Sequence, residues 1–361
     1  MRVTFVIPSM TSGGAERALA VIANSWAERG DSVTLLTFDD GATPPFYPLS
    51  DRINHRALNL LKSSKGLWDA IQQNVRRTFV LRAAIKATSP EVVISFLLRA
   101  NVRVLLAMIG NKIPVIVSER NDPWLAKPGE IWKRLAKITY PWAAKITVHT
   151  KRSAQFFPAS WQRKICVIPN SLLIEAKPKP GTNGQQIIAI GRLEEQKAFD
   201  VLLPAFALIA NEFPEAKLTI WGEGSQRKRL ESLRESLHLQ DRVMLPGVTK
   251  NIVGELSNSD LFVQSSRWEG FGNALCEAMS IGLPAISTDC SGPREIIRNG
   301  VDGILVPVGN IEALAEAMKQ VLSNHSLRQE LGKCALEIGE RFLLQRMLEH
   351  WQNAIDEARA N

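Results

Sequence analysis

Short strand-like runs alternate with longer amphipathic segments through the whole chain, and this alternation restricts the fold more than any other feature. In the first half, the apolar runs fall at residues 3–8, 32–38, 92–96, 114–118, 145–149 and 166–168. In the second half, they fall at residues 186–190, 217–221, 243–245, 261–264 and 284–288. Short β runs separated by helical segments predict parallel sheets with helices on both faces. The fold class is therefore α/β.

The length of the chain, 361 residues, predicts two domains, because a single hydrophobic core rarely grows that large. A segment rich in Pro, Gly, Asn and Lys separates the two sets of runs and is typical of a linker. We expect two Rossmann-like domains, with the linker between them and a helix at the end. The boundaries we predict are residues 1–170, 171–185, 186–335 and 336–361.

Charge is unevenly spread along the chain. Residues 1–170 hold 24 Lys+Arg against 11 Asp+Glu, whereas residues 171–361 hold 20 against 25. A basic first half suits an anionic membrane or a nucleic acid. No apolar run reaches the ~18–20 residues that cross a bilayer, and the first run is too short for a secretory signal. The four cysteines lack metal or redox spacing, so we expect a reducing cytoplasm and no structural metal.

The sequence WEGFGNALCE at residues 268–277 places Glu269 and Glu277 on either side of a glycine-rich turn between a strand and a helix. Gly270 and Gly272 allow the backbone to approach a ligand closely. One carboxylate can bind a sugar hydroxyl and the other a ribose, with an anion between them. The anion would lie on the amides that open the helix, those of Asn273, Ala274 and Leu275. The alternative is an ordinary turn with two surface glutamates.

A second candidate segment, GRLEEQK at residues 191–197, follows the run at 186–190. Ligands of open parallel sheets bind beyond the carboxyl ends of the strands. Arg192 offers a planar fork and Lys197 a point charge, and together they can grip a diphosphate. Two solvated loop cations would give the same pattern.

These two segments resemble the E-x7-E and G-R-x4-K-x2-D elements of family 4, the retaining nucleotide-sugar glycosyltransferases with the GT-B fold. Ala198 stands where that family often has glycine. The resemblance implies two Rossmann-like domains facing across a cleft, with the last helix crossing back to the first domain. The sequence DCSGPREII at residues 289–297 is similar to the bacterial members that transfer N-acetylhexosamines of the GalNAc type to lipid-linked oligosaccharides.

The resemblance also implies roles for individual residues. Arg192 and Lys197 would hold the donor diphosphate, Glu269 would contact the transferred sugar, and Glu277 would bind the ribose. Further contacts to the nucleotide sugar are implied for Gly13, Gly14, Glu223, Val248, Gly272, Asn273, Ala274 and Leu275. Two cations and a helix N-terminus can stabilise the leaving diphosphate, so we expect no metal and no cofactor. The resemblance to the family implies that the reaction retains the anomeric configuration.

Two segments of the first half are candidates for the acceptor. The family's histidine is absent from the loop at residues 118–122, where Glu119 and Arg120 are the residues we assign to the acceptor. A helical stripe of Trp68, Ile71, Val75 and Phe79 continues into cations, as expected for a membrane surface and a lipid-linked phosphate. The cations we assign to the lipid diphosphate are Arg76, Arg77, Arg82 and Lys86. A partly buried helix with a solvated basic end is the alternative.

The function we expect is transfer of GalNAc or GlcNAc from a UDP donor to a polyprenyl-diphosphate-linked saccharide in bacterial glycan assembly. The enzyme would lie peripherally on the inner face of the cytoplasmic membrane. A soluble acceptor such as a sugar phosphate is an alternative within the same enzyme class. A nucleic-acid-binding protein is a further alternative, but no nucleic-acid motif is present and the donor-side residues would then have no role.

Overall fold

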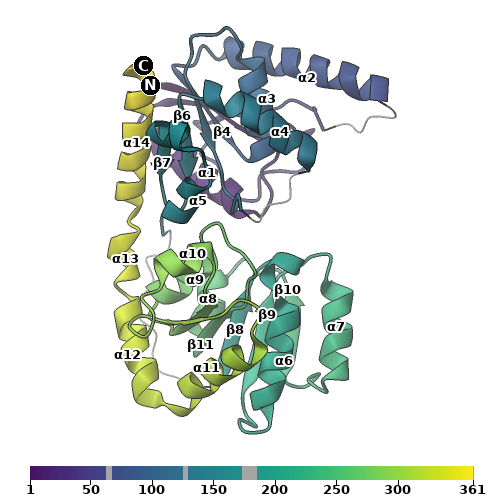
Figure 1. Cartoon of the computed structure of the whole chain (residues 1–361), viewed down its shortest axis with the longest axis vertical. Coiled ribbons are helices and arrows are strands. Elements are labelled where there is room, and N and C mark those ends of the chain that lie inside the picture. Colours follow the sequence, from purple (N-terminus) through teal and green to yellow (C-terminus); the bar gives the residue numbers. More distant parts are fainter. Residues whose placement is uncertain (62–66, 125–128, 173–184, 361) are drawn as a thin grey trace. The chain divides into compact units, whose positions relative to one another are not determined.

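The computed structural model describes residues 1–61, 67–124, 129–172 and 185–360, without the side chains of residues 67–71. The chain divides into two compact units (Figure 1). Unit 1 comprises Met1–Asn170 together with Gln345–Asn361, and unit 2 comprises Ser171–Leu344. Residues 173–184 of the expected linker lie outside the described residues.

Unit 1 contains a parallel sheet of seven strands in the order β3-β2-β1-β4-β5-β6-β7. The strands are β1 (Arg2–Ile7), β2 (Ser32–Thr37), β3 (Asn54–Ala57), β4 (Val92–Phe96), β5 (Val115–Ser118), β6 (Lys145–Val148) and β7 (Ile165–Val167). Six of them coincide with predicted apolar runs to within two residues. The remaining strand, β3, lies at the sheet edge and is mostly exposed, so it has no apolar run that would reveal it.

Helices connect the strands of unit 1, and the last helix of the chain belongs to this unit. They are α1 (Gly14–Glu28), α2 (Leu67–Ala87), α3 (Leu98–Ala107), α4 (Glu130–Thr139), η1 (Tyr140–Trp142), α5 (Lys151–Gln155), η2 (Ala159–Lys164) and α14 (Leu344–Ala360). Trp351 of α14 is fully buried and stacks on Phe96 of β4, with ring centroids 5.9 Å apart. This contact anchors α14 to the sheet. No helix in the described part of the chain is both long and apolar enough to span a membrane.

Helix α2 buries a different face from the stripe that the sequence analysis singled out. Leu81 and Ile85 enter the core of unit 1, whereas Val75 and Phe79 are 51% and 67% exposed. Apolar residues therefore occupy two sides of this helix. The exposed side continues the stripe whose first members, at residues 68 and 71, have no described side chains.

Unit 2 contains a parallel sheet of six strands in the order β10-β9-β8-β11-β12-β13. The strands are β8 (Gln186–Ile190), β9 (Lys217–Trp221), β10 (Val243–Gly247), β11 (Leu261–Gln264), β12 (Ala285–Thr288) and β13 (Ile304–Val306). The helices are η3 (Glu195–Lys197), α6 (Phe199–Ala210), α7 (Arg227–Ser236), α8 (Ile252–Ser257), α9 (Asn273–Ser280), α10 (Ser291–Ile296), α11 (Ile311–Ser323), α12 (His325–Ala335) and α13 (Ile338–Arg341). The segment 336–361 is expected from the sequence as one helix, but its described residues contain two, α13 and α14.

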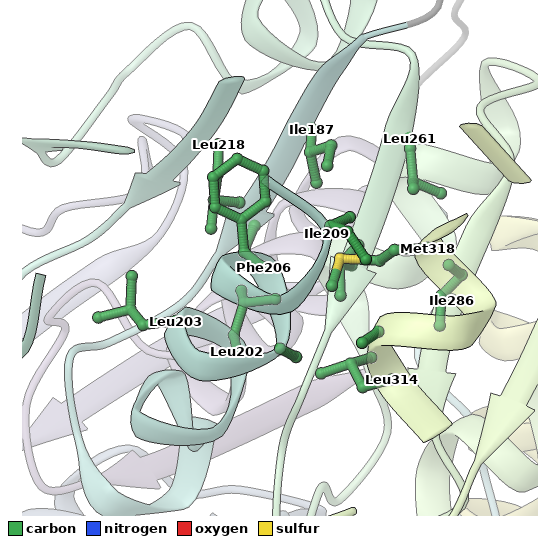
Figure 2. Packing of buried hydrophobic residues seen from close by; sticks show 14 of the residues in the cluster. Ile187, Leu202, Leu203, Phe206, Ile209, Leu218, Leu261, Ile286, Leu314 and Met318 are labelled. Carbon is green, nitrogen blue, oxygen red and sulfur yellow. The ribbon is translucent and has the colours of Figure 1, made fainter. Parts of the chain in front are cut away.

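The core of unit 2 holds β8 and β11 side by side. Figure 2 shows Phe206 of α6 and Met318 of α11 among the buried residues that pack with Ile187, Leu218 and Leu261 of the sheet. Strands β8 and β11 are hydrogen-bonded neighbours in parallel. The loops that leave their carboxyl ends are therefore adjacent, and these are the two loops that carry the predicted donor residues.

Candidate active site

The loop after β8 begins at a glycine that lies under the stem of a lysine. A Cβ added at Gly191 would lie 2.8 Å from Cε of Lys197. Gly222, at the end of β9, has φ +150°, and a Cβ there would overlap the carbonyl oxygen of Gly191. The loops after β8 and β9 therefore approach so closely that a side chain at position 222 is excluded, whereas one at position 191 would displace the stem of Lys197.

Lys197 and Glu269, which are 72 positions apart in the sequence, form an ion pair at the ends of β8 and β11. The Lys197 ammonium donates to Oε1 of Glu269, and the hydroxyl of Ser266 donates to the same oxygen at 2.7 Å. The two side chains are 17% and 9% exposed. The pair thus joins a cation and a carboxylate in a mostly buried setting, where their attraction is only weakly screened.

A second ion pair joins the start of α6 to the loop after β11. The guanidinium of Arg267 binds both carboxylate oxygens of Asp200 at 2.9 Å. Burial raises the pKa of Asp200, but the hydrogen bonds and charge of Arg267 outweigh this effect and the net pKa is lowered. Gln196 adds a hydrogen bond of 3.0 Å to the carbonyl of Trp268. Asp200 therefore orients the loop that carries Glu269, a role that sequence reasoning missed.

Arg192 is exposed on the loop after β8, and it donates a long hydrogen bond of 3.5 Å to Gln196. Ala198 follows Lys197 and joins η3 to α6 in the left-handed region, with φ 52° and ψ 40°. This conformation favours glycine. The alanine therefore holds a strained backbone directly beside the lysine.

Helix α9 begins at Asn273, after Gly272 with φ 132°. Its amides, including those of Ala274 and Leu275, begin the helix as predicted. Glu277, one turn further on, is a buried carboxylate. Burial raises the pKa of the Cys276 thiol well above its usual value, and the charge of Glu277 adds to that shift. The two glutamates of the E-x7-E element thus lie on the loop after β11 and inside the helix that follows.

Helix α10 packs closely against the loop that carries Glu269. A Cβ at Gly292, the second residue of α10, would overlap the carbonyl oxygen of Phe271. Only glycine allows this close approach. Position 292 therefore helps to determine where residues 268–272 lie.

The loops after β9 and β10 lie next to each other. Gly222 donates to the carbonyl of Gly247 at 2.7 Å. Glu223 forms an ion pair with Arg227, and Val248 is largely exposed. Glu223 and Val248, for which the family resemblance implies contacts to the nucleotide sugar, therefore lie just after the carboxyl ends of β9 and β10.

In unit 1, Gly13 caps the start of α1 and Gly14 is the first residue of that helix. A Cβ at Gly13 would overlap the carboxylate of Glu16, which is buried and accepts a hydrogen bond of 3.3 Å from Thr11. Because Gly13 has φ −86°, which any residue can adopt, its glycine is explained by the space that the Glu16 carboxylate occupies and not by an unusual backbone conformation.

Glu119 follows β5 and is buried within a polar cluster. The hydroxyl of Tyr140 donates to Glu119, and the amide of Asn101 donates to it at 3.3 Å. The Ser95 hydroxyl in turn donates to Asn101 at 2.8 Å. Burial raises the pKa of Glu119 to about 7, although both hydrogen bonds act in the opposite direction. Glu119 therefore faces the interior of unit 1.

Arg120 is also buried, but its neighbours differ from those of Glu119. Its Nη1 lies 3.1 Å from Nδ1 of His149 and donates to Oδ1 of Asn170 at 3.1 Å. Its guanidinium also lies over the rings of Phe96 and Trp351. The neighbouring residues Glu119 and Arg120, which we predicted as one acceptor site, therefore belong to two separate clusters.

The basic residues predicted on α2 have unequal surroundings. Arg76 and Lys86 are exposed, whereas Arg82 donates to the carbonyls of Ala107 and Ile109 at the end of α3. A phosphate would have to replace those contacts to bind Arg82.

Arg77 lies close to two arginines that sequence reasoning did not single out. Arg103 lies 5.0 Å from the ring centroid of Trp132, and Arg99 lies 5.7 Å from it. The pKa of Arg103 is lowered, first by burial and then by the positive charges of Arg77 and Arg99. We call Arg77, Arg99 and Arg103 the arginine cluster. The signal available in the sequence was the spacing of four residues between Arg99 and Arg103, which puts them on one face of α3.

Similar proteins were found among curated sequences and solved structures. An enzyme of Campylobacter jejuni subsp. jejuni is 28% identical over 99% of both chains, and its name is GalNAc-alpha-(1->4)-GalNAc-alpha-(1->3)-diNAcBac-PP-undecaprenol alpha-1,4-N-acetyl-D-galactosaminyltransferase. A second enzyme of that organism, N-acetylgalactosamine-N,N'-diacetylbacillosaminyl-diphospho-undecaprenol 4-alpha-N-acetylgalactosaminyltransferase, is 26% identical over 90% of both chains. Anabaena HepE in complex with UDP and glucose superimposes with a TM-score of 0.80 at 18% identity, over 99% of both chains.

Two family models match consecutive parts of the chain. Glycosyltransferase Family 4 matches residues 12–172, and Glycosyl transferases group 1 matches residues 173–337. Sucrose-phosphate synthase from Thermosynechococcus elongatus shares the fold over 100% of both chains, with a TM-score of 0.85 at 17% identity. Together with the two parallel sheets, these matches confirm the predicted fold and family: the chain belongs to the GT-B glycosyltransferases of the family 4 type.

Proposed function

We propose that this glycosyltransferase moves an N-acetylhexosamine from a UDP-sugar to a polyprenyl-diphosphate-linked saccharide, with retention of configuration and without a metal ion. The ion pair of Lys197 with Glu269, at the adjacent ends of β8 and β11, is the observation that carries this proposal. It supports the donor side of the proposal, because a cation that would stabilise the leaving diphosphate lies next to a carboxylate that would contact the transferred sugar.

Each donor residue would contribute to departure of UDP. As the bond between the sugar and the β-phosphate breaks, negative charge grows on the diphosphate. Lys197 and the exposed Arg192 would stabilise that charge, since both belong to the segment that follows β8. The amides at the start of α9 add positive potential. Glu277 would hold the ribose hydroxyls, and Glu269 would hold a hydroxyl of the sugar.

Two observations favour a lipid-linked acceptor. The two Campylobacter relatives are named for undecaprenol diphosphate substrates. In unit 1, the arginine cluster offers a concentration of positive charge that suits a diphosphate. The relatives' names also support GalNAc as the transferred sugar.

Exposed apolar side chains in unit 1 favour a peripheral position on an anionic membrane. Ile131 and Ile138 on α4 are both exposed and lie seven residues apart, so they share one face of the helix. The same helix carries Lys133, Arg134 and Lys137. A helix with apolar and basic side chains binds at a lipid surface by burying the former and pairing the latter with headgroups.

A screen for UDP release would test the enzymatic part of the proposal. Purified protein would be incubated with UDP-GalNAc, UDP-GlcNAc or UDP-glucose, together with either a polyprenyl-diphosphate disaccharide or a sugar phosphate. We expect release above background only with a UDP-N-acetylhexosamine and the lipid-linked acceptor. Turnover of the sugar phosphate at a similar rate would contradict the lipid-linked acceptor, while leaving the enzyme class intact.

Co-sedimentation with vesicles would test the membrane part. The double variant Phe79→Ser/Ile131→Ser should bind more weakly than the wild type to vesicles that contain phosphatidylglycerol. Leu208→Ser is the matched control, because Leu208 is equally exposed but lies on α6 of unit 2. Equal binding of all three proteins would contradict the proposed membrane face.

A further inference from the structure

Arg120 is a buried cation without a carboxylate partner among the described residues. Its side chain is 7% exposed, and it forms no ion pair in the described part of the chain. Charged side chains are almost never buried unless they are paired, because leaving water is costly for an ion. The position of Arg120 therefore requires an explanation.

The hydrogen bonds of Arg120 are divided unequally over its guanidinium. Nη1 contacts His149 and Asn170, whereas Nε and Nη2 are buried and have no hydrogen-bond partner within the part of the chain that the structure describes. The N–H groups of Nε and Nη2 point in the same direction from a planar group. They form the fork that binds two oxygens of a phosphate or a carboxylate side by side.

The described neighbours of Arg120 do not supply the missing negative charge. Glu119, the adjacent carboxyl, faces Tyr140 and Asn101 instead. The pKa of His149 is lowered well below its usual value by burial and then by Arg120, so this neighbour is neutral at physiological pH. Burial alone lowers the pKa of Arg120 to about 9, which still leaves it protonated at that pH.

We propose that the unpartnered fork of Arg120 binds an oxyanion of the phosphate class at the carboxyl edge of the unit 1 sheet. Arg120 follows β5, and its partners His149 and Asn170 come after β6 and β7. This is the edge where open parallel sheets bind their ligands. The inference rests on the proposed function, which supplies two phosphate sources, the UDP donor and the acceptor diphosphate. A phosphate must displace side-chain atoms over the fork, so binding is coupled to local rearrangement.

The competing explanation is a structural one, in which Arg120 only anchors α14 through the ring of Trp351. The guanidinium lies 5.5 Å from that ring centroid and 4.8 Å from that of Phe96. A purely structural arginine resembles Arg242, whose N–H groups bind the carbonyls of Ala216 and Phe213. Replacing such a residue destabilises the fold but leaves anion binding unchanged.

Inorganic phosphate is a direct probe of the fork. Thermal unfolding would be measured with and without phosphate, against chloride at matched ionic strength, in the background Arg192→Ala/Lys197→Ala. That background removes the proposed donor cations, so failure of the donor site does not affect the result. We expect phosphate to raise Tm in this background, and Arg120→Met to abolish the rise. Arg242→Met, the matched control, should lower Tm and keep the rise.

Kinetics of Arg120→Lys in the otherwise wild-type chain would identify the source of the phosphate. Lysine keeps the charge but lacks the fork, so the affected substrate should show a KM raised roughly 10- to 100-fold. A raised KM for the lipid-linked acceptor alone assigns the fork to the acceptor, and one for UDP-sugar alone assigns it to the donor. The inference is overturned if phosphate raises Tm equally with and without Arg120. If Arg120→Met does not fold, Arg120→Lys is compared in its place. A rise in Tm with phosphate as large in Arg120→Lys as in the background protein would then overturn the inference.

Discussion

Replacing Lys197 with alanine tests whether this residue stabilises the departing UDP. The change removes the ammonium that contacts Glu269 at the end of β8 and leaves the rest of the loop in place, because the main anchors of the loop are Asp200 and Arg267. We expect kcat to fall while the KM for the donor changes little, since the interaction is strongest when charge has developed on the diphosphate.

The size of the effect follows from the surroundings of the lysine. A cation about 4 Å from a phosphate oxygen contributes about 4 kcal/mol at an effective dielectric constant of about 20. Lys197 is 17% exposed, which is consistent with that intermediate screening. The adjacent carboxylate of Glu269 offsets part of the attraction. A net loss of about 3 kcal/mol remains, which lowers kcat by roughly 100- to 1,000-fold.

Continuous detection of UDP release at saturating donor would measure kcat. Lys319→Ala provides a matched control, because Lys319 forms an ion pair with Glu212 that is exposed on both sides. Its kcat should equal that of the wild type, and Lys197→Arg should retain more activity than Lys197→Ala. A kcat for Lys197→Ala within about threefold of the control would refute the assigned role, because it corresponds to less than about 1 kcal/mol.

Three further predictions follow from buried groups and close contacts. Glu277→Ala should weaken UDP binding roughly 10- to 100-fold in calorimetry, through lost hydrogen bonds to the ribose; unchanged affinity would contradict that assignment. Burial raises the pKa of Glu119 to about 7 from an ordinary 4.5, so its contribution to stability is complete below about pH 4.5 and is lost as the pH rises through about 7. Glu119→Gln should therefore raise Tm near pH 8 by removing a cost on the order of 3 kcal/mol, but not near pH 4.5, and a gain that does not depend on pH would contradict the stated cause. Gly292→Ala should displace the carbonyl of Phe271 and reduce kcat/KM at least about tenfold, because catalytic groups on the loop would be misplaced. Gly339→Ala should leave kcat/KM unchanged, because a Cβ there meets no described atom within 4 Å.

Most of the architecture was predictable from the sequence, because buried parallel strands are continuous apolar runs. The two strands without a predicted run, β3 and β13, have four and three residues and lie at sheet edges. The buried face of α2 was not predictable. Its sequence has apolar residues on two sides, and only tertiary packing selects Leu81 and Ile85 over Val75 and Phe79.

The candidate site was predictable as a set of loops but not as a set of contacts. Lys197 and Glu269 could be placed after two strands, yet the sequence does not state that β8 and β11 are neighbours. The pair of Asp200 with Arg267 was missed for the same reason, because it joins residues 67 positions apart. The separation of Glu119 from Arg120 depends on which partners surround each side chain, and those partners come from six different segments of unit 1.

The left-handed conformation of Ala198 has a consequence for how the donor is received. An alanine there costs roughly 1–2 kcal/mol that a glycine would avoid, but it also narrows the range of shapes open to residues 195–198 before any nucleotide arrives. A loop that is already ordered loses less entropy on binding. Glycine at this position would remove the strain but would allow the backbone more conformations. The variant with glycine would therefore form a productive complex more slowly than the chain with alanine.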